Sequence, residues 1–398
     1  MRFASLLTSA AALLLLLCQA APAYLQKKAL IFELDEGYGN GVVEIQDMTA
    51  LRRIAANLRA FATKFEIYAL LPASVADRSR LTKVLDALQA EGIPFVLEAE
   101  SSDTIAINSN AANAPYDAAH GFGASVEEFR ALKARYGRFF AGIRFMEVFG
   151  ETQQIIGCQR FAASWCGRFA KVLPSDNFFE KSLVEPYVAF AQRSGMFVLF
   201  GDHFWAANYD PRRQTYDGLP YFNKTARVTP SIFNDVIKQP QNERDLQDLA
   251  AKYPGAIVAL YDNNDGAGGV DSSAAKIDTW EAQIMRPLIA TGGFRGFGLS
   301  DQAWLCPERP VGNDGSVCPV EGVITWADKA LAQGALVIET EPYWYWFQLP
   351  PGVLPDHDYT GEPQWADRGY ATSNLQALAS HFGVALPAQS IRAPVHRK

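Results

Sequence analysis

Acidic residues recur at the ends of short apolar segments throughout the chain, and aromatic residues follow several of them closely. These acids are Glu33, Asp35, Glu98, Glu100, Glu147, Glu151, Asp202, Asp262, Asp301, Glu339 and Glu341. Carboxylates beside aromatic rings are typical of glycosidic bond hydrolysis. One acid protonates the leaving oxygen, a second activates water or attacks, and the rings hold the sugars. The pattern therefore predicts a sugar-cleaving site with carbohydrate as its partner.

Glu147 is the candidate general acid. It stands between Phe145 and Phe149 in the sequence. Burial of a carboxyl group against aromatic rings raises its pKa, and a general acid has to keep its proton near neutral pH. The alternative is that Glu147 forms an ion pair with Arg144 or with another cation on the rim. Glu151 competes for the role of acid, but it lies further into the following loop, and we expect it to contact a sugar.

Asp301 and Glu341 are the candidates for activating water. Trp304 follows Asp301, and the aromatic run 343–347 follows Glu341. We expect these two acids on neighbouring strands and Glu147 across from them, which leaves space for a sugar ring and a water molecule. This favours an inverting mechanism, for which the carboxyl groups are about 6.5–9.5 Å apart. The alternative for the aromatic run is core packing and a lid over the barrel.

Other residues on the same segments are candidates for sugar contact. They are Asp202, His203, Trp205, Trp304, Glu339, Tyr343 and Trp344. The stretch Asp262–Gly266 is rich in oxygen ligands and resembles a calcium loop, but Ser273 occupies the position where such a loop needs a glutamate. Phosphate-binding glycine loops and HExxH or GxSxG motifs are absent from the sequence. We therefore expect no metal and no cofactor.

Short apolar segments alternate with helical patterns, which indicates a parallel sheet with crossover helices. The predicted strands are Ala29–Leu34, Glu66–Leu71, Pro94–Glu98, Gly142–Val148, Met196–Asp202, Ala256–Asp262, Phe294–Asp301 and Ala335–Glu339. The predicted helices are Thr49–Phe65, Arg78–Glu91, one opened by a Ser125–Glu128 capping box, Asp176–Ser194, Gln241–Tyr253, Ser273–Ala290, Thr325–Gln333 and Thr372–Phe382.

Eight strands and eight helices predict an α/β fold of the (β/α)8 TIM-barrel type, as a single domain over residues 24–398 with an extension after about residue 348. An open doubly wound sheet is the rival, but the first strand-to-helix turn lacks a GxGxxG motif. The long segments all follow strands, so in a barrel they lie on the carboxyl-terminal rim, where substrate sites form. These segments are Ala99–Ala124, Phe149–Ser175, His203–Pro240 and Gln302–Ile324.

Residues 1–23 have the pattern of a secretory signal peptide, with Arg2, an apolar run and the small residues Ala21-Pro22-Ala23. We expect a secreted or periplasmic protein with no membrane association once the signal is removed. The formal net charge of −7 and the lack of basic runs make nucleic acid an improbable partner.

Four cysteines remain after the predicted signal peptide. They are Cys158, Cys166, Cys306 and Cys318. An oxidising compartment allows disulfides, and four cysteines permit three pairings. We prefer Cys158 with Cys166 and Cys306 with Cys318, each of which closes a short loop on the rim. The alternative is four buried thiols.

Three segments together resemble glycoside hydrolase family 98. They are Phe140–Gly150, Phe297–Trp304 and the stretch from Ala330 into the aromatic run. The resemblance implies a TIM barrel in which Glu147 matches the general acid, and Asp301 with Glu341 matches the pair that activates water. Glu339 is the alternative match to Glu341. It also implies inverting, endo-acting hydrolysis, with blood-group-type glycans and xylan among the family's substrates. No β-sandwich domain after the barrel is visible in this sequence.

Two other functions stay open at this point. A secreted barrel that binds glycans without cleaving them would keep the aromatic groove and lose the acid geometry. A polysaccharide lyase would use similar residue types but would form an unsaturated product.

Overall fold

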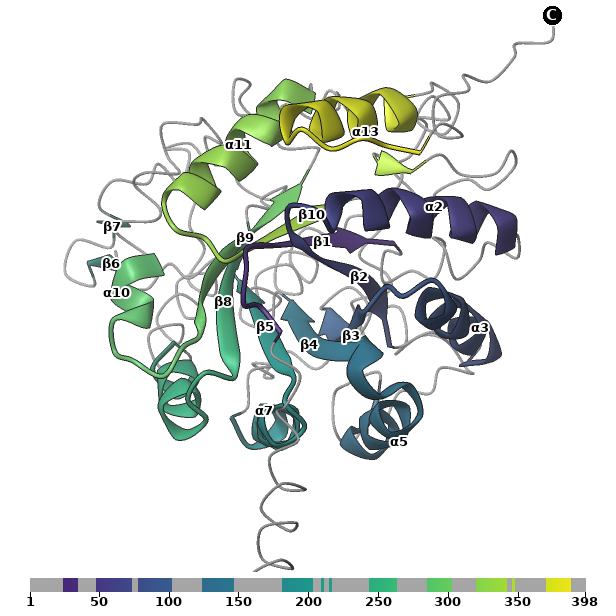
Figure 1. Cartoon of the computed structure of the whole chain (residues 1–398). Coiled ribbons are helices and arrows are strands. Elements are labelled where there is room, and N and C mark those ends of the chain that lie inside the picture. The colour runs from purple at the N-terminus through teal and green to yellow at the C-terminus, as the bar shows by residue number, and fades with distance from the viewer. Residues whose placement is uncertain are drawn as a thin grey trace, which may run out of the picture.

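The protein folds as a closed barrel of eight parallel strands with helices around it (Figure 1). The computed structural model describes residues 24–34, 48–73, 78–101, 124–146, 181–202, 209–210, 215–216, 243–262, 285–302, 320–341, 346–347 and 370–387. The barrel strands are β1 (Ala29–Glu33), β2 (Glu66–Pro72), β3 (Phe95–Ser101), β4 (Phe140–Met146), β5 (Phe197–Asp202), β8 (Ile257–Asp262), β9 (Gly296–Gln302) and β10 (Val337–Glu341). Their order is β1-β10-β9-β8-β5-β4-β3-β2. This is the (β/α)8 topology that the sequence predicts.

Each predicted strand is present, with boundaries that move by a few residues. The last strand continues beyond Glu339 to include Glu341. The fourth strand begins at Phe140 and ends at Met146, so Glu147 follows this strand and lies outside the described residues. A short antiparallel pair, β6 (Tyr209–Asp210) with β7 (Thr215–Tyr216), was not predicted.

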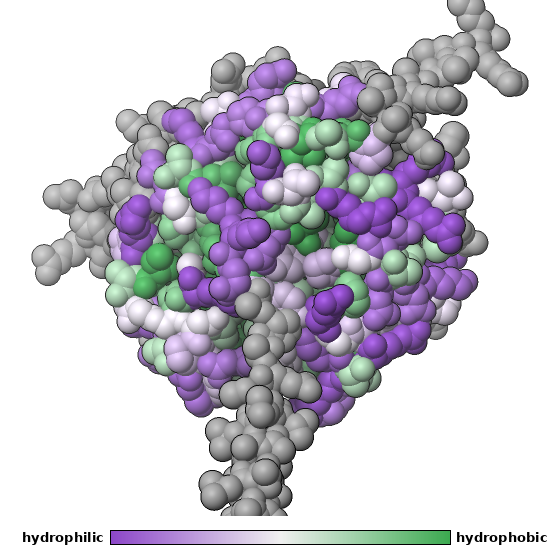
Figure 2. All heavy atoms as spheres, viewed as in Figure 1, coloured by the Kyte–Doolittle hydropathy of each residue, from purple (hydrophilic) through white to green (hydrophobic). Residues whose placement is uncertain are grey.

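The helices lie on the outside of the barrel (Figure 1). They are α2 (Met48–Phe61), α3 (Arg78–Ala90), α5 (Val126–Tyr136), α7 (Lys181–Arg193), an α-helix over residues 243–252, α10 (Arg286–Ile289), α11 (Val320–Ala332) and α13 (Tyr370–His381). A 3₁₀ turn, η1 (Gly137–Phe139), leads into β4. Helix α11 begins earlier than predicted, at Val320 instead of Thr325. Figure 2 shows hydrophilic side chains over most of the face in view, with hydrophobic residues in smaller areas between them.

Strand residues alternate between two cores because successive side chains point to opposite faces. One set, which includes Phe32, Leu97 and Phe145, packs outward beneath the helices. The other set fills the barrel interior. Its strand members are Ala29, Ile31, Tyr68, Leu70, Val96, Ala141, Phe197, Leu199, Val258, Leu260 and Val337. The interior is therefore a packed core and not a pore.

The chain before β1 packs against the amino-terminal end of the barrel. Glu66 Oε1 and Oε2 accept backbone N–H groups from Leu25 at 2.6 Å, Gln26 at 2.7 Å and Lys27 at 2.9 Å. The Tyr24 ring lies edge-on to Phe197, with 6.1 Å between ring centroids. These contacts cover the base of the barrel and leave its carboxyl-terminal end as the place for a site.

Candidate functional site

The barrel interior changes from apolar to charged along the direction of the strands. Val96 precedes Glu98 on β3, and Val337 precedes Glu339 on β10, with both valines in the interior core. On β4, Arg144 follows the interior residue Ala141 by three positions, and the pairing of β4 with β3 shifts register between Phe140 and Gly142. The charged residues therefore lie toward the carboxyl ends of the strands, which is the end where TIM barrels form their sites.

Arg144 joins two of these acids in one buried network. Its Nη1 donates to Glu98 Oε2, and its Nη2 donates to Glu339 Oε1. Ser300 Oγ donates to the same Glu339 oxygen at 3.3 Å. The side chains of Arg144, Glu98 and Glu339 are 3%, 6% and 0% exposed. Water therefore screens these charges little, and the ion pairs are held in a medium of low dielectric constant.

The network spans the barrel from one wall to the other. Glu98 and Arg144 are register partners on adjacent strands, and so are Ser300 and Glu339. The ion pair between Arg144 and Glu339 is different, because β4 and β10 are separated by three strands in either direction around the barrel. It therefore connects opposite walls through the interior.

Acids outnumber bases at this level of the barrel. Glu33, the last residue of β1, is also buried, and β1 pairs with β10. With Glu98 and Glu339 this makes three buried carboxyl groups to the one guanidinium of Arg144 among the described interior residues. Three of the acids predicted at the strand ends therefore lie buried toward the carboxyl-terminal end of the barrel.

The structure describes the three predicted catalytic acids to different extents. Glu147 lies outside the described residues. Asp301 and Glu341 are described by their positions in the strands, where Asp301 pairs in register with Thr340 and Glu341 with Gln302. The strands that carry these two acids are adjacent, as predicted, and β4 lies directly opposite β10. The roles of all three acids stay predictions.

Most of the predicted sugar contacts and all predicted disulfides lie outside the described residues. These are Glu151, His203, Trp205, Trp304, Tyr343, Trp344, Cys158, Cys166, Cys306 and Cys318, together with residues 1–23 and 263–266. Asp202 is described by its position at the end of β5, opposite Tyr261 in register. Trp346 and Phe347, at the end of the aromatic run, are buried against Phe32, with ring centroids 6.5 and 5.7 Å away. The core-packing alternative therefore holds for these two rings.

Glu339 was predicted as a sugar contact, but its described partners are Arg144 and Ser300 inside the barrel. From the sequence, Arg144 is considered only as a possible ion-pair partner of Glu147, and no role is assigned to Ser300. The signal that could have found the network was charge at alternate, inward positions of strands that are otherwise apolar. A charge on the same face as valines is buried and needs a partner across the interior.

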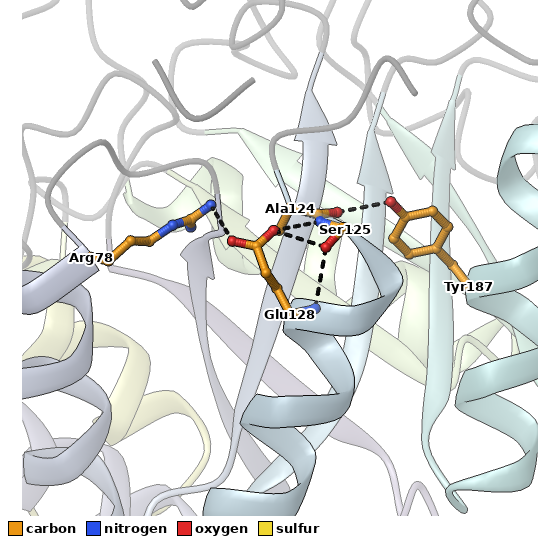
Figure 3. A network of polar contacts seen from close by, with 5 residues as sticks. All are labelled: Arg78, Ala124, Ser125, Glu128 and Tyr187. Atoms are coloured by element: carbon orange, nitrogen blue, oxygen red, sulfur yellow. Dashed lines mark hydrogen bonds and ion pairs between the residues drawn. The ribbon is translucent and has the colours of Figure 1, made fainter. Parts of the chain in front are cut away.

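A second polar network fixes the helices beneath the rim (Figure 3). Ser125 Oγ accepts the Glu128 N–H at 3.2 Å, and Glu128 Oε2 accepts the Ser125 N–H at 2.7 Å, so the predicted capping box is confirmed. Arg78, at the start of α3, forms an ion pair with Glu128 at 3.3 Å. Tyr187 of α7 donates to the Ala124 carbonyl at 2.8 Å. The start of α5 is thus tied to both neighbouring helices.

No cluster of three or more metal-ligating side chains occurs among the described residues. Within the same ranges, the helices are too short or too polar to cross a membrane.

The fold and the buried network define a (β/α)8 barrel with an acid-rich carboxyl-terminal end. No family model and no curated protein matches the sequence. Among solved structures, the chain is similar to the catalytic module of a family 98 glycoside hydrolase from Streptococcus pneumoniae TIGR4, in complexes with the H-disaccharide and with the LewisY pentasaccharide. Both matches have 14% identity and a TM-score of 0.43, and cover 81% of this chain and 48% of the other. The chain thus spans about half the length of those chains.

The similarity extends to barrels with other activities. Triosephosphate isomerase from Bartonella henselae matches at 11% identity and a TM-score of 0.38, covering 79% of this chain and 92% of the other. At these identities and TM-scores the comparisons do not indicate an activity for this chain.

Proposed function

We propose that the protein is an inverting, endo-acting glycoside hydrolase in which Glu147 is the general acid and Asp301 and Glu341 activate water. The observation that carries the proposal is the strand order. The strand before Glu147 lies opposite β10, while β9 and β10 are adjacent. An inverting enzyme needs its acid and its base on opposite sides of the sugar, with room for water on one side.

The charge at this end of the barrel supports the same proposal. The buried carboxylates outnumber Arg144, and a negative environment favours the protonated form of a further carboxyl group nearby. This would help Glu147 keep the proton that it has to deliver to the leaving oxygen. Further proposed contacts to the sugars are Glu151, Asp202, His203, Trp205, Trp304, Tyr343 and Trp344.

The proposal is tested by incubating the purified protein with a panel of polysaccharides and complex glycans and assaying new reducing ends. We expect cleavage of at least one glycan, with a bell-shaped pH profile whose alkaline limb reports Glu147 losing its proton. Glu147→Gln should bind the same glycan and lower kcat by about 100-fold or more. Binding without cleavage by the wild type would instead support a glycan-binding barrel, and an ultraviolet-absorbing unsaturated product would support a lyase.

We also propose that residues 1–23 direct export and are removed, and that the four rim cysteines form two disulfides. N-terminal sequencing of the exported protein should then begin at Tyr24. Mass spectrometry of unreduced peptides should link Cys158 to Cys166 and Cys306 to Cys318. Free thiols at these positions would contradict the disulfides without affecting the proposed chemistry.

A further inference from the structure

We propose that Arg144 is a positioning residue that holds opposite walls of the barrel at a fixed separation beneath the site. Its ion pair with Glu339 joins β4 to β10. Arg144 precedes the candidate acid Glu147 by three residues, and Glu339 precedes Glu341 by two. The inference rests on the proposed function, because these two acids are the groups that would be positioned.

Backbone hydrogen bonds already fix the distance between neighbouring strands, but they do not act between opposite walls. Glu98 and Arg144 are register partners on β3 and β4, so their ion pair adds to a connection that the sheet provides. Glu339 and Arg144 share no backbone ladder. Below this level, apolar side chains such as Val96 and Val337 fill the interior. At the level of Arg144, a directional ion pair spans the interior, and it sets a distance more narrowly than apolar contacts do.

Arginine is suited to this role because its planar guanidinium presents several N–H groups in fixed directions. Arg144 uses two of them, Nη1 toward β3 and Nη2 toward β10. Ser300 donates to the same Glu339 oxygen that accepts from Nη2 and so restrains the Glu339 side chain from β9. The network therefore includes β4, which precedes Glu147, and the strands β9 and β10, which contain Asp301 and Glu341. A lysine has a single ammonium group and could not hold both carboxylates in this geometry.

Stability alone does not account for such a network. Replacing a buried ion pair or triad by apolar residues of similar volume is often neutral or stabilising, because removing charges from water is costly. Most of the other described interior residues are hydrophobic, and Glu33 is a further buried charge at this end of the barrel. The ion pair between Arg144 and Glu339 is explained if the separation of β4 and β10 matters for catalysis.

The test compares crystal structures and kinetics of the wild type with Arg144→Lys, Glu339→Gln and Glu98→Gln. Glu339→Gln removes the carboxylate that pairs with Arg144 across the barrel, whereas Glu98→Gln removes a carboxylate that is also buried but lies on the strand next to Arg144. Arg135→Lys on α5, where Arg135 forms an exposed ion pair with Asp86, is the matched control. All assays are run well below the unfolding temperature of each variant, so that only folded protein is compared.

We expect Arg144→Lys and Glu339→Gln to change the Cα separation of residues 146 and 341 by on the order of 1 Å and to lower kcat by roughly 100-fold, with KM little changed. Glu98→Gln should have a smaller effect on both, and Arg135→Lys none. A rise in KM without a fall in kcat for Glu339→Gln would assign Glu339 to sugar contact and overturn the inference. Folded variants with unchanged wall separation and kcat would also overturn it.

The inference and the proposed function fail in different ways. A wild type that cleaves no glycan would contradict the proposed function, while the structures would still decide whether Arg144 sets the wall separation. If Arg144→Lys does not fold, Glu339→Gln, which keeps the shape of the side chain and a carbonyl acceptor, decides the question by the same two measurements.

Discussion

Arg144 shows how one residue can organise the interior of a barrel. It is enclosed by Glu98 and Glu339 and is 3% exposed, so its charge has to be met by partners inside the protein. Arg144 lies among apolar residues of β4, a pattern that is consistent with a buried charge. The pattern does not reveal the partners, because Glu339 lies 195 positions away and meets Arg144 only when the barrel closes.

Lys133 offers a residue-scale prediction at the opposite end of the barrel. Its Nζ donates to the Phe140 carbonyl at 2.8 Å and lies 5.6 Å from the centroid of the Tyr24 ring. Burial lowers the pKa of Lys133 to about 8, so the unfolded chain, with an ordinary lysine pKa of 10.5, binds more protons above this pH. The penalty for burying the charge is present below about pH 8 and is relieved as the pH rises toward the unfolded value.

The free energy of unfolding should therefore rise with pH between about 7.5 and 9.5 more steeply in the wild type than in Lys133→Met. Urea unfolding at a series of pH values measures this difference. Lys64→Met, which removes an exposed lysine, should keep the slope of the wild type. Equal slopes in wild type and Lys133→Met would show that burial does not shift the pKa of Lys133.

At the scale of elements, the sequence predicts the barrel well and the site only in part. All eight strands and the alternation with helices follow from apolar runs, capping residues and glycine stops, which are local signals. Glycine 334, for example, ends α11 with a φ of 100°, a conformation that favours glycine. The residues at which strands begin and end were less predictable than the strands themselves. Glu341 is polar, yet β10 includes it, because pairing with Gln302 of β9 extends the strand.

The site was less predictable because its contacts join distant segments. The residue types at the strand ends could be predicted from the sequence, and the structure has acids at the carboxyl-terminal end of the barrel. The sequence does not show which of the acids are buried. It does not reveal, for example, that Glu339 is held inside the barrel by Arg144. The order of the strands around the barrel, which no local pattern contains, determines which charges meet.

The capping box of α5 gives a prediction at this scale. Ser125→Ala removes the oxygen that accepts the Glu128 N–H, and loss of an N-cap costs about 1 kcal/mol of stability. Chemical unfolding should show this loss, whereas Ser380→Ala, at an exposed position of α13, should not destabilise the protein. An unchanged free energy of unfolding in Ser125→Ala would mean that the network around Arg78 and Tyr187 fixes this helix without the cap.

For the molecule as a whole, charge limits the class of glycan that the proposed enzyme would accept. The chain has a formal net charge of −7, and the described part of the barrel interior holds three buried carboxyl groups and one guanidinium. An anionic substrate would be repelled by this field. The repulsion should weaken with salt, because the Debye length falls from about 30 Å at 0.01 M to about 8 Å at 0.15 M.

We therefore expect kcat/KM to be higher for a neutral glycan than for the same glycan oxidised to uronic acids, by about tenfold at low ionic strength, with a smaller ratio at 0.15 M salt. Reducing-end assays on the two matched substrates measure this ratio. A preference for the oxidised glycan would indicate that cations outside the described residues dominate the field at the site.

The central claim is that the closed barrel places a proton donor after β4 across from a water-activating pair on β9 and β10. It is tested most directly by a crystal structure with an oligosaccharide bound, from which the separations between the Glu147 carboxyl group and those of Asp301 and Glu341 are measured. We predict that all three face the sugar, with Glu147 about 6.5–9.5 Å from at least one of the others. Separations of about 5 Å, or carboxyl groups that do not face a common sugar, would contradict the claim.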